Sequence, residues 1–314
     1  MAWYLVTGGA GFIGSHIVER LVKDGHQVKV IDNLVAGNKE NLASVIDDIE
    51  FIEGDIRNLS LLQKIMKGVD YVIHQAALRS VPKSVENPLE YDEVNVHGTL
   101  NVFIAARDNG VKRVVYASSS SVYGDQPTLP EREDMLPLLV SPYAASKLAN
   151  EYYARCFYHN YGLETVGLRY FNVFGPRQSL DNQYAVVIPK FITCILKNDP
   201  PPIHGDGSQT RDFTYIDNVV DGNLLACQKE GIGGEIFNLA CGQSCSVLDL
   251  VKFINDILGK DVQPIFTPPR PGDVKHTLAD TTKLKDVMGF SCRVDLMEGL
   301  RRTVDWFKAN IGRI

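Results

Sequence analysis

The sequence predicts an α/β protein with a doubly wound parallel sheet, followed by a smaller, loop-rich α/β domain. In the first half of the chain, short β-branched runs alternate with longer amphipathic stretches, which is the pattern of successive βαβ units. A glycine-rich turn directly follows the first of these runs. After Gly175-Pro176 the alternation fades, and clusters of proline and glycine mark long connections. The length of 314 residues suits one large domain or two.

Strands and helices can be assigned in order from this pattern. The strand candidates are residues 3–6, 28–31, 49–52, 69–74, 111–116 and 165–169. The helix candidates between them include residues 14–24, 59–67, 89–108 and 143–161. Because the connections are long enough for crossovers, we expect the strands to lie parallel, with helices on both faces of the sheet.

Composition and charge exclude several classes of protein. The chain carries 32 Lys and Arg against 38 Asp and Glu, and its net charge of −6 argues against a nucleic-acid partner. The 6 cysteines include no C-x-x-C pair, so we expect reduced thiols. Neither a signal peptide nor an apolar run of about 18 residues is present, so we expect a cytoplasmic protein with no membrane partner. The histidines lack metal-ligand spacing, so no metal site is predicted.

The glycine-rich turn has the spacing of a dinucleotide-binding site. Gly9-x-Gly11-x-x-Gly14 lies between the first strand and an apolar helical pattern, which is the Rossmann-type context for pyrophosphate at a helix N-terminus. Asp32 ends the second strand, where a carboxylate can accept hydrogen bonds from ribose hydroxyls and disfavours a 2′-phosphate. The alternative is a plain glycine turn near an exposed aspartate. The combined placement predicts NAD as the cofactor.

Polar and small residues after the next two strands extend this candidate site. Asp55-Ile56 follows the third strand, and Gln75-Ala76-Ala77 follows the fourth. We expect them beside the adenine and the nicotinamide ribose, respectively, because the carboxyl ends of parallel strands meet at one edge. Taken alone, they are equally well explained as ordinary loop residues.

A tyrosine and a lysine on one predicted helix form a candidate catalytic pair. Ser141-Pro142 is suited to start that helix, and Tyr143 and Lys147 then lie on the same face as i,i+4 neighbours. An ammonium group beside a phenol lowers the phenol pKa and makes it a general base. The Y-x-x-x-K spacing is common by chance. Here, however, a hydroxyl-rich strand end, residues 117–124, points to the same edge and can supply a serine to hold a substrate hydroxyl.

These motifs together resemble the extended short-chain dehydrogenase/reductase family, specifically its nucleotide-sugar 4-epimerases. The likeness rests on T-G-G-x-G-x-x-G, the aspartate after the second strand, the serine cluster ending in Val-Tyr-Gly, and S-P-Y-x-x-x-K. Further motifs are similar to UDP-hexose 4-epimerases, and among these to the group that handles UDP-N-acetylglucosamine. They occupy residues 168–175, 187–191, 205–213 and 270–274.

The resemblance implies a reaction and a catalytic group. Tyr143 would take the proton of the sugar C4 hydroxyl, Ser119 would hydrogen-bond that oxygen, and Lys147 would lower the tyrosine pKa. Tightly held NAD would accept the C4 hydride and return it to the opposite face of the rotated 4-keto sugar, with no net redox change. The cofactor-binding residues so implied are Gly8, Gly11, Phe12, Ile13, Asp32, Asn33, Asp55, Ile56, Gln75, Ala76, Ala77, Asn95, Tyr143, Lys147 and Tyr170.

The resemblance also implies how a UDP-sugar would bind. Arg211 and Arg270 would hold the diphosphate, Asp273 the uridine ribose, and Asn172 the region between phosphate and sugar. The backbone around Val187, Ile203 and His204 would hold the uracil. The full substrate set is Arg79, Ser80, Ser119, Ser120, Asn172, Gln178, Val187, Ile203, His204, Arg211, Arg270, Asp273 and Thr277.

The choice of sugar depends on a few of these positions. In the resembling epimerases a bulky tyrosine at the position of Thr277 excludes an N-acetyl group, so threonine predicts that an N-acetylhexosamine is admitted. Ser80 and Gln178 also match the N-acetyl-accepting pattern. Arg79 and Val186 depart from this pattern. The N-acetyl-accepting epimerases have a small residue at the position of Arg79 and alanine at that of Val186.

Several alternatives stay open. Arg79 could face a sugar carboxylate, as in a UDP-glucuronate 4-epimerase, although uronate-specific relatives have Thr at the position of Asn172 and Arg at that of Ser179. An enzyme for UDP-glucose alone and a non-catalytic dinucleotide sensor are further alternatives. A dehydratase is disfavoured, because Ser120-Ser121 stands where dehydratases have an Asp-Glu pair.

The domain organisation and oligomeric state follow from the same resemblance. Residues 1–172 would form the NAD-binding domain, with return segments near 212–240, and residues 173–314 would mainly bind the UDP-sugar. A homodimer is implied, formed through the predicted helices 89–108 and 143–161.

Overall fold

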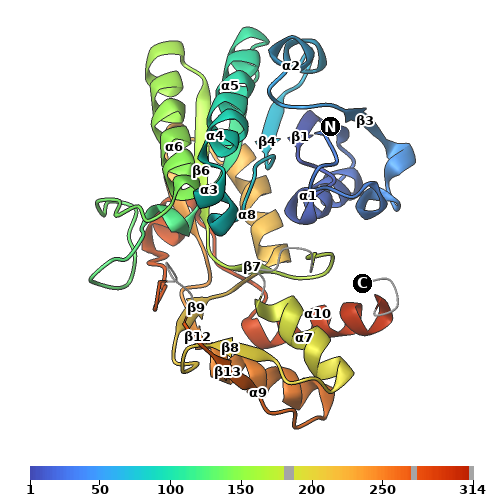
Figure 1. The fold of residues 1–314 in the computed structure, drawn as a ribbon. Coiled ribbons are helices and arrows are strands. Elements are labelled where there is room, and N and C mark those ends of the chain that lie inside the picture. The colour runs from blue at the N-terminus through green and yellow to red at the C-terminus, as the bar shows by residue number, and fades with distance from the viewer. Residues whose placement is uncertain (180–186, 270–273, 311–314) are drawn as a thin grey trace.

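The computed structural model describes residues 1–179, 187–269 and 274–310, and these form two lobes (Figure 1). The first lobe contains a 7-stranded parallel sheet with the order β11-β6-β5-β4-β1-β2-β3. The strands are β1 (Trp3–Thr7), β2 (Gln27–Asp32), β3 (Ile49–Glu53), β4 (Tyr71–His74), β5 (Arg113–Ser119), β6 (Glu164–Tyr170) and β11 (Ile236–Leu239). All the strands predicted from the sequence are present, and the Rossmann-type fold class is confirmed.

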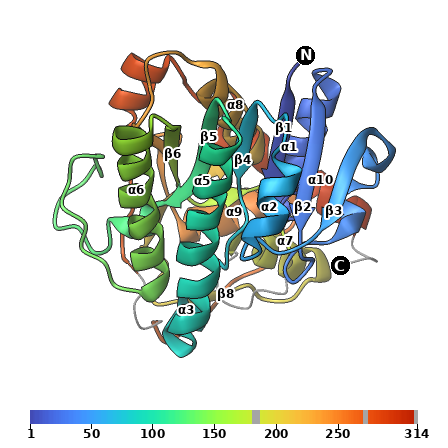
Figure 2. The ribbon, with the colours of Figure 1, turned by 90° about the horizontal axis from the view of Figure 1, so that it is seen from above.

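Helices cover both faces of this sheet (Figure 2). On one face α1 (Phe12–Lys23) packs against α8 (Ile216–Gln228), and on the other α5 (Gly98–Asp108) lies between α2 (Leu59–Ile65) and α6 (Pro142–Tyr161). Each face has its own apolar cluster. Strands β1, β4, β5 and β6 are largely buried, and their apolar runs made them readable from the sequence. Strand β2 and the edge strand β3 instead alternate apolar with polar residues.

The predicted helix 89–108 is a continuous helical run with a change of pitch. It consists of α4 (Pro88–Tyr91), a π-helical segment η3 (Asp92–His97) and α5. A preceding short helix, α3 (Val81–Glu86), was not predicted, and it begins at the capping hydroxyl of Ser80.

The second lobe is smaller and rich in loops, as predicted. Its helices are α7 (Val187–Lys197), α9 (Val247–Leu258) and α10 (Leu296–Asn310). Its strand pairs are β8 (Pro202–His204) with β13 (Ile265–Thr267) and β9 (Thr210–Asp212) with β12 (Ser244–Ser246). A parallel pair, β7 (Val173–Phe174) with β10 (Thr214–Tyr215), lies where the chain passes between the lobes. The remaining short helical segments are η1 (Lys39–Leu42), η2 (Ile46–Asp48), η4 (Ser120–Val122) and η5 (Leu284–Met288).

The chain crosses between the lobes more than once. After β8 and β9 in the second lobe, it returns through β10 to α8 and β11, and β11 pairs in register with β6. The sheet edge beside β6 is therefore completed by a segment from late in the sequence. Within the described ranges, no helix is long and apolar enough to cross a membrane.

Candidate functional site

Most of the predicted site residues lie at one edge of the sheet, where the parallel strands end. This edge faces the second lobe (Figure 1). The predicted residues found here, at or just after strands β1 to β6, are Gly8, Gly11, Asp32, Asn33, Asp55, Ile56, Gln75, Ala76, Ala77, Ser119, Ser120, Tyr170 and Asn172. The carboxyl edge of such a sheet is the usual ligand site of this architecture.

The glycine turn after β1 has no room for side chains. Gly8 has φ +68°, and a Cβ atom there would lie 2.7 Å from the backbone nitrogen of Ala76. A Cβ atom on Gly14 would lie 2.2 Å from the carbonyl oxygen of Gly8. Helix α1 begins at Phe12, and Gly11 before it provides no side-chain cap. The N–H groups of Phe12 and Ile13 therefore lie in a first turn with no intrahelical acceptor, which suits a pyrophosphate.

Asp32 lies beside this turn at the end of β2. Its carboxylate accepts the N–H of Ala10 at 3.0 Å and the N–H of Leu34 at 2.8 Å, and burial raises its pKa. The neighbouring Asn33 donates to Asp55 at 2.9 Å. The buried Asp32 carboxylate suits ribose hydroxyls and disfavours a second phosphate, so it fits NAD.

The end of β4 is connected to β6 and α8 by a buried polar network. The side-chain amide of Gln75 donates to the Tyr170 hydroxyl at 2.9 Å and to Asn223 Oδ1 at 3.3 Å. The Tyr170 hydroxyl donates to the same Asn223 oxygen at 3.0 Å, and burial raises its pKa. Asn223 was not found by sequence reasoning, because it stands in α8, far from every motif.

Asn95 lies behind the loop that follows β4. Its side chain is fully buried, accepts the N–H of Leu78 at 2.8 Å, and donates to the Leu78 carbonyl at 2.9 Å and to Ser146 at 3.1 Å. All three hydrogen bonds join the Asn95 side chain to other protein groups, so in this structure Asn95 stabilises the loop that follows β4.

The three predicted catalytic residues meet at the start of α6. Ser141 caps the helix by accepting the N–H of Ala144 at 3.1 Å, as the sequence predicts. The Tyr143 hydroxyl is hydrogen-bonded to Ser119 at the end of β5. Lys147 lies one turn along the helix, with its Nζ 5.9 Å from the centroid of the Tyr143 ring.

The electrostatics of this group differ from the sequence-based expectation. Burial raises the pKa of Tyr143, while the bond to Ser119 and the positive charge of Arg79 lower it to a smaller extent. Burial also lowers the pKa of Lys147 to about 8. The expected lowering of the tyrosine pKa is therefore not present in the protein alone, because desolvation outweighs the nearby donors.

Helices α3 and α4 form a wall beside Tyr143. The Tyr91 and Tyr143 rings meet edge to face, with centroids 6.4 Å apart. Ser84 accepts the N–H of Tyr143 at 3.1 Å, and the N–H of Ser80 donates to the Tyr91 hydroxyl at 3.0 Å. Sequence reasoning missed Tyr91 and Ser84, since no motif marks them.

Arg79 stands on this wall, directly before the capping Ser80. The residue is solvent-exposed, yet desolvation by surrounding protein atoms lowers the pKa of its guanidinium. No hydrogen bond or ion pair of this guanidinium occurs in the part of the chain that the structure describes. An unpaired cation therefore lies close to Tyr143.

A group of predicted substrate residues meets between the lobes. Asn172, with a φ of 32°, donates to the Asp212 carbonyl at 3.1 Å and lies 3.5 Å from Thr277 Oγ1. Arg211 donates to the backbone carbonyls of Thr210 at 2.9 Å and Lys275 at 3.0 Å. Three segments distant in sequence are thus brought together here.

Other predicted substrate residues lie around this group. The Gln178 side chain donates to the Val173 carbonyl at 2.9 Å, and its buried Oε1 accepts no hydrogen bond from any described residue. His204 bonds Thr267 at 2.8 Å beside the fully buried Ile203 of β8. Val187 begins α7. The predicted Arg270 and Asp273, and the sugar-pocket position Val186, lie outside the described residues.

A buried carboxyl pair beneath this group was not predicted. Asp212 accepts the N–H groups of Ala279 at 3.3 Å and Gly242 at 3.0 Å, and burial raises its pKa to about 6. Burial and the nearby Asp212 raise the pKa of Glu131 to about 8, and Glu131 Oε2 has no partner among the described residues. Only tertiary structure brings these carboxyls together.

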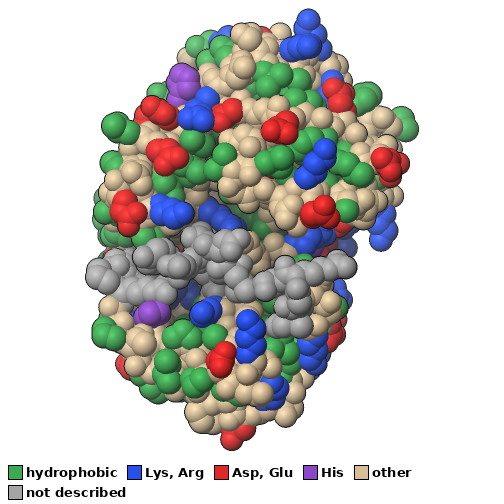
Figure 3. Space-filling view, turned by 45° about the vertical axis from the view of Figure 1, so that its right-hand side comes forward, with side chains coloured by type: hydrophobic (Ala, Val, Ile, Leu, Met, Phe, Trp, Pro, Cys, Tyr) green, Lys and Arg blue, Asp and Glu red, His purple; other side chains and the backbone are tan. Residues whose placement is uncertain are grey.

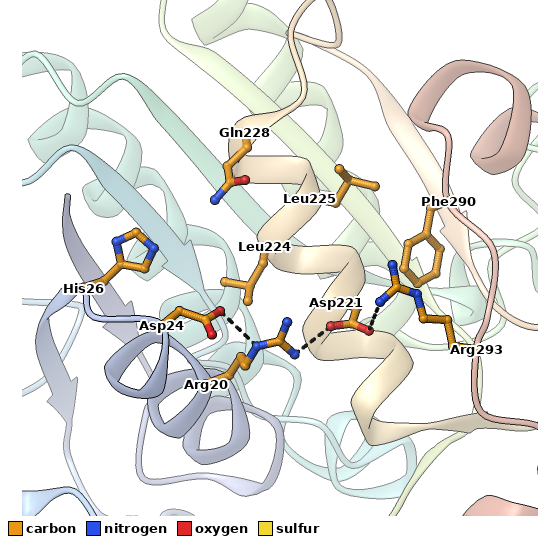
Figure 4. Close-up of a pocket in the computed structure, with 9 residues that line it drawn as sticks. All are labelled: Arg20, Asp24, His26, Asp221, Leu224, Leu225, Gln228, Phe290 and Arg293. Carbon is orange, nitrogen blue, oxygen red and sulfur yellow. Dashed lines mark hydrogen bonds and ion pairs between the residues drawn. The ribbon is translucent and has the colours of Figure 1, made fainter. Parts of the chain in front are cut away.

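A separate hollow of about 280 Å³ lies away from this site, between the C-terminal ends of α1 and α8 (Figure 4). Its charges pair with one another: Arg20 bonds Asp24 at 2.9 Å and Asp221 at 2.8 Å, and Arg293 approaches Asp221 at 3.9 Å. Two arginines and two aspartates thus face one another in this hollow. Across residues 1–179, 187–269 and 274–310, no group of three His, Cys, Asp or Glu could hold a metal ion.

Part of the surface of the second lobe is positively charged where this lobe borders the first. Figure 3 shows Lys and Arg side chains gathered on this lobe and along the boundary between the lobes. Such a distribution favours the approach of an anionic ligand, although the net charge of the chain is −6.

The fold and this site define a dinucleotide-dependent enzyme of the short-chain dehydrogenase/reductase class. The model of the NAD dependent epimerase/dehydratase family matches residues 4–240, and the chain belongs to this family. The sequence-based assignment to this class, with NAD as cofactor, is confirmed.

Individual relatives cover nearly the whole chain. A putative UDP-glucose 4-epimerase of Methanocaldococcus jannaschii is 42% identical over 308 residues, covering 98% of each chain. A UDP-glucuronate 4-epimerase of Thermodesulfobacterium geofontis is 37% identical, covering 99% of this chain and 98% of the relative. The solved structure of UDP-N-acetylglucosamine 4-epimerase from Methanobrevibacter ruminantium in complex with UDP-N-acetylmuramic acid is 44% identical, with a TM-score of 0.94 and coverage of 98% and 99%.

Proposed function

We propose that the protein catalyses the C4 epimerisation of a UDP-sugar, with UDP-N-acetylglucosamine and UDP-N-acetylgalactosamine as the principal pair and UDP-glucose and UDP-galactose as a second pair. The observation that carries this proposal is the contact of the Tyr143 hydroxyl with Ser119 at the carboxyl edge of the sheet. The names of relatives that cover nearly the whole chain support the same class of reaction.

In this proposal the chain moves one proton and holds one sugar. Tyr143 accepts the proton of the C4 hydroxyl and later returns it, while Ser119 keeps the oxygen in position. When bound, NAD supplies the acceptor for the C4 hydride and gives the hydride back. Lys147, buried with its Nζ bonded to the Ala117 carbonyl at 2.9 Å, supplies a positive charge below the tyrosine ring.

We assign the two halves of the site to the two lobes. Residues 1–172, with the segment near 212–240, would hold NAD, and residues 173–314 would mainly hold the UDP-sugar. Arg211 and Arg270 would bind the diphosphate, since guanidinium groups suit phosphate oxygens. Thr277, beside Asn172, would leave space for the N-acetyl group.

A second candidate substrate is UDP-glucuronate. The specific observation in its favour is the guanidinium of Arg79 near Tyr143, which has no partner among the described residues and which a carboxylate on C5, the neighbour of C4, could reach. Asn172 and Ser179 oppose this reading, because the uronate-specific pattern has Thr and Arg there.

We also propose a homodimer formed through the helical run α4–η3–α5 and α6. Large apolar or aromatic side chains stand exposed on this side of the molecule, including Leu89, Tyr152 and Tyr153. Light scattering on the purified protein would test the dimer.

The test of function is an NMR time course with UDP-N-acetylglucosamine and no added NAD, beside parallel samples with UDP-glucose and UDP-glucuronate. Growth of the UDP-N-acetylgalactosamine anomeric signal is the expected result. Conversion of UDP-glucuronate alone would favour the second candidate and assign Arg79 to its carboxylate. Conversion of no substrate, with or without added NAD, would contradict the proposal.

A further inference from the structure

Two cysteines distant in sequence meet beside the end of β11. Cys241 follows this strand, and the Cys292 thiol donates to the carbonyl oxygen of Ala240 at 3.3 Å. The Cys292 thiol is also within hydrogen-bonding reach of the Cys241 side chain. On the other side, the side-chain amide of Asn218 lies 3.7 Å from Cys241 Sγ. The two cysteine side chains thus lie close to each other, between β11, α8 and the loop before α10.

Both thiols are accessible from one hollow. Cys241 and Cys292 are each half-buried and line a hollow of about 280 Å³. The other cysteines differ in this respect. Cys156 is exposed on α6, whereas Cys194, Cys227 and Cys245 are buried. Of all the cysteines in the chain, this pair alone combines mutual contact with access.

The charges around the hollow favour chemistry at these sulfurs. Lys285 and Arg293 line it, opposed by Asp295. Positive charges favour the thiolate and attract an anionic reagent. The hydrogen bond with Cys241, together with burial, raises the pKa of Cys292 well above its usual range. Because the Cys292 thiol donates its proton to the Ala240 carbonyl, we assign the first attack to Cys241.

We propose that Cys241 and Cys292 form a redox-active dithiol that closes to an intramolecular disulfide with an anionic low-molecular-weight disulfide, such as oxidised glutathione, as oxidant. The Cys241 thiolate attacks one sulfur of the small disulfide and releases the first small thiolate. Cys292 then loses its proton to solvent, attacks the Cys241 sulfur and releases the second. Two protein thiols are oxidised, and one small disulfide is reduced to two thiols.

The disulfide would act on the turn that holds Asp212. The N–H groups of Cys241 and Gly242 donate to the two carboxylate oxygens of Asp212, at 3.3 and 3.0 Å. Asp212 directly follows Arg211 in β9. Because the S–S bond must draw Cys241 towards Cys292, we expect these two N–H bonds to weaken on oxidation.

The experiment uses the full-length protein in buffers of reduced and oxidised glutathione, with readouts that do not depend on enzymatic activity. After oxidation, trapping and denaturation, we expect the thiol titre to fall from 6 to 4 per chain. Mass spectrometry of the unreduced digest should show a peptide that links Cys241 and Cys292. Amide exchange should become faster at Cys241 and Gly242, and dithiothreitol should reverse every change.

Matched variants decide the assignment. Cys241→Ser and Cys292→Ser should each abolish the link, whereas Cys156→Ser, which removes an exposed thiol elsewhere, should leave it intact. A titre that stays unchanged, separate glutathione adducts without a link, or a link through other cysteines would overturn the proposal. Unchanged amide exchange in the linked protein would overturn the connection to Asp212.

Discussion

Lys147 and Tyr143 do not meet through their polar groups: the Lys147 Nζ donates to the Ala117 carbonyl at 2.9 Å and lies 5.9 Å from the centroid of the Tyr143 ring. The hydroxyl of Tyr143 is instead bonded to Ser119. In the proposed mechanism the lysine would therefore act through its positive charge rather than through a hydrogen bond to the tyrosine hydroxyl. Among the groups that lower the tyrosine pKa, the nearby cation on the open side of the site is Arg79.

Replacing Arg79 should move the pH dependence of the reaction. In Arg79→Gln the tyrosine loses a positive charge that lowers its pKa, so the acid limb of the kcat/KM profile should shift to higher pH. The profile measured with the best substrate checks this. Lys83→Gln, which removes an exposed cation on the adjacent helix, is the control. An unshifted acid limb in Arg79→Gln would show that this charge does not act on the base.

Removing the Tyr143 hydroxyl should abolish turnover but not cofactor binding. Tyr143→Phe loses the proposed base, and we expect kcat to fall by about 10²- to 10⁴-fold, the usual contribution of general base catalysis. NAD bound to the purified protein can be measured by absorbance after denaturation and should be unchanged. Tyr153→Phe, an exposed position on the same helix, should retain activity. Full activity of Tyr143→Phe is incompatible with the proposed mechanism.

A bulky residue at Thr277 should change the choice of sugar. Thr277→Tyr places a ring beside Asn172, where the N-acetyl group is proposed to lie, and should suppress turnover of the acetylated pair by roughly 10- to 200-fold relative to UDP-glucose. Thr277→Val, which removes the same hydroxyl without adding a ring, should keep the original ratio. Comparing kcat/KM for both substrate pairs tests this. Equal losses on both pairs would refute the steric assignment.

The buried carboxyl of Glu131 should make stability depend on pH. Its pKa is raised from 4.5 to about 8, so the folded state binds the proton more tightly than the unfolded state, and stability is lost as pH rises from 4.5 through 8. Glu131→Gln removes this loss. The variant should gain roughly 1–3 kcal/mol relative to the wild type between pH 5 and about 8, as measured by urea denaturation.

The matched control for that measurement is Glu230→Gln, which neutralises an exposed carboxylate far from Asp212. Its stability difference from the wild type should stay flat over the same range. A flat difference for Glu131→Gln as well would show that the buried pair does not titrate in this window.

The elements with local signals were predictable. Strands β1, β4, β5 and β6 are largely buried runs rich in apolar residues, and β2 and β3 alternate apolar with polar residues, so each carries a local strand pattern. The turn at Gly8 depends on its own conformation and on contact with one neighbouring loop. Tyr143 and Lys147 share a helix face because of their i,i+4 spacing. The capping serine Ser141 is equally local.

The elements without local signals were missed or only partly described. The π-helical segment η3 arises within a run that reads as one ordinary helix. Strand β11 has only 4 residues and follows a long excursion, and its place beside β6 depends on the return of the chain to the first lobe. No periodicity in the sequence encodes such a return.

By itself, therefore, the sequence determined the class of fold, the dinucleotide turn and the pairing of Tyr143 with Lys147, because each depends on neighbours within a few residues or on the periodicity of one element. Only the tertiary structure decided that Asn172 lies 3.5 Å from Thr277, 105 residues later, and that the Arg79 guanidinium, which has no partner among the described residues, lies close to Tyr143. Those contacts depend on how loops from two lobes pack together. The free energy that stabilises them comes from packing across the whole core, so no single segment of the sequence encodes them.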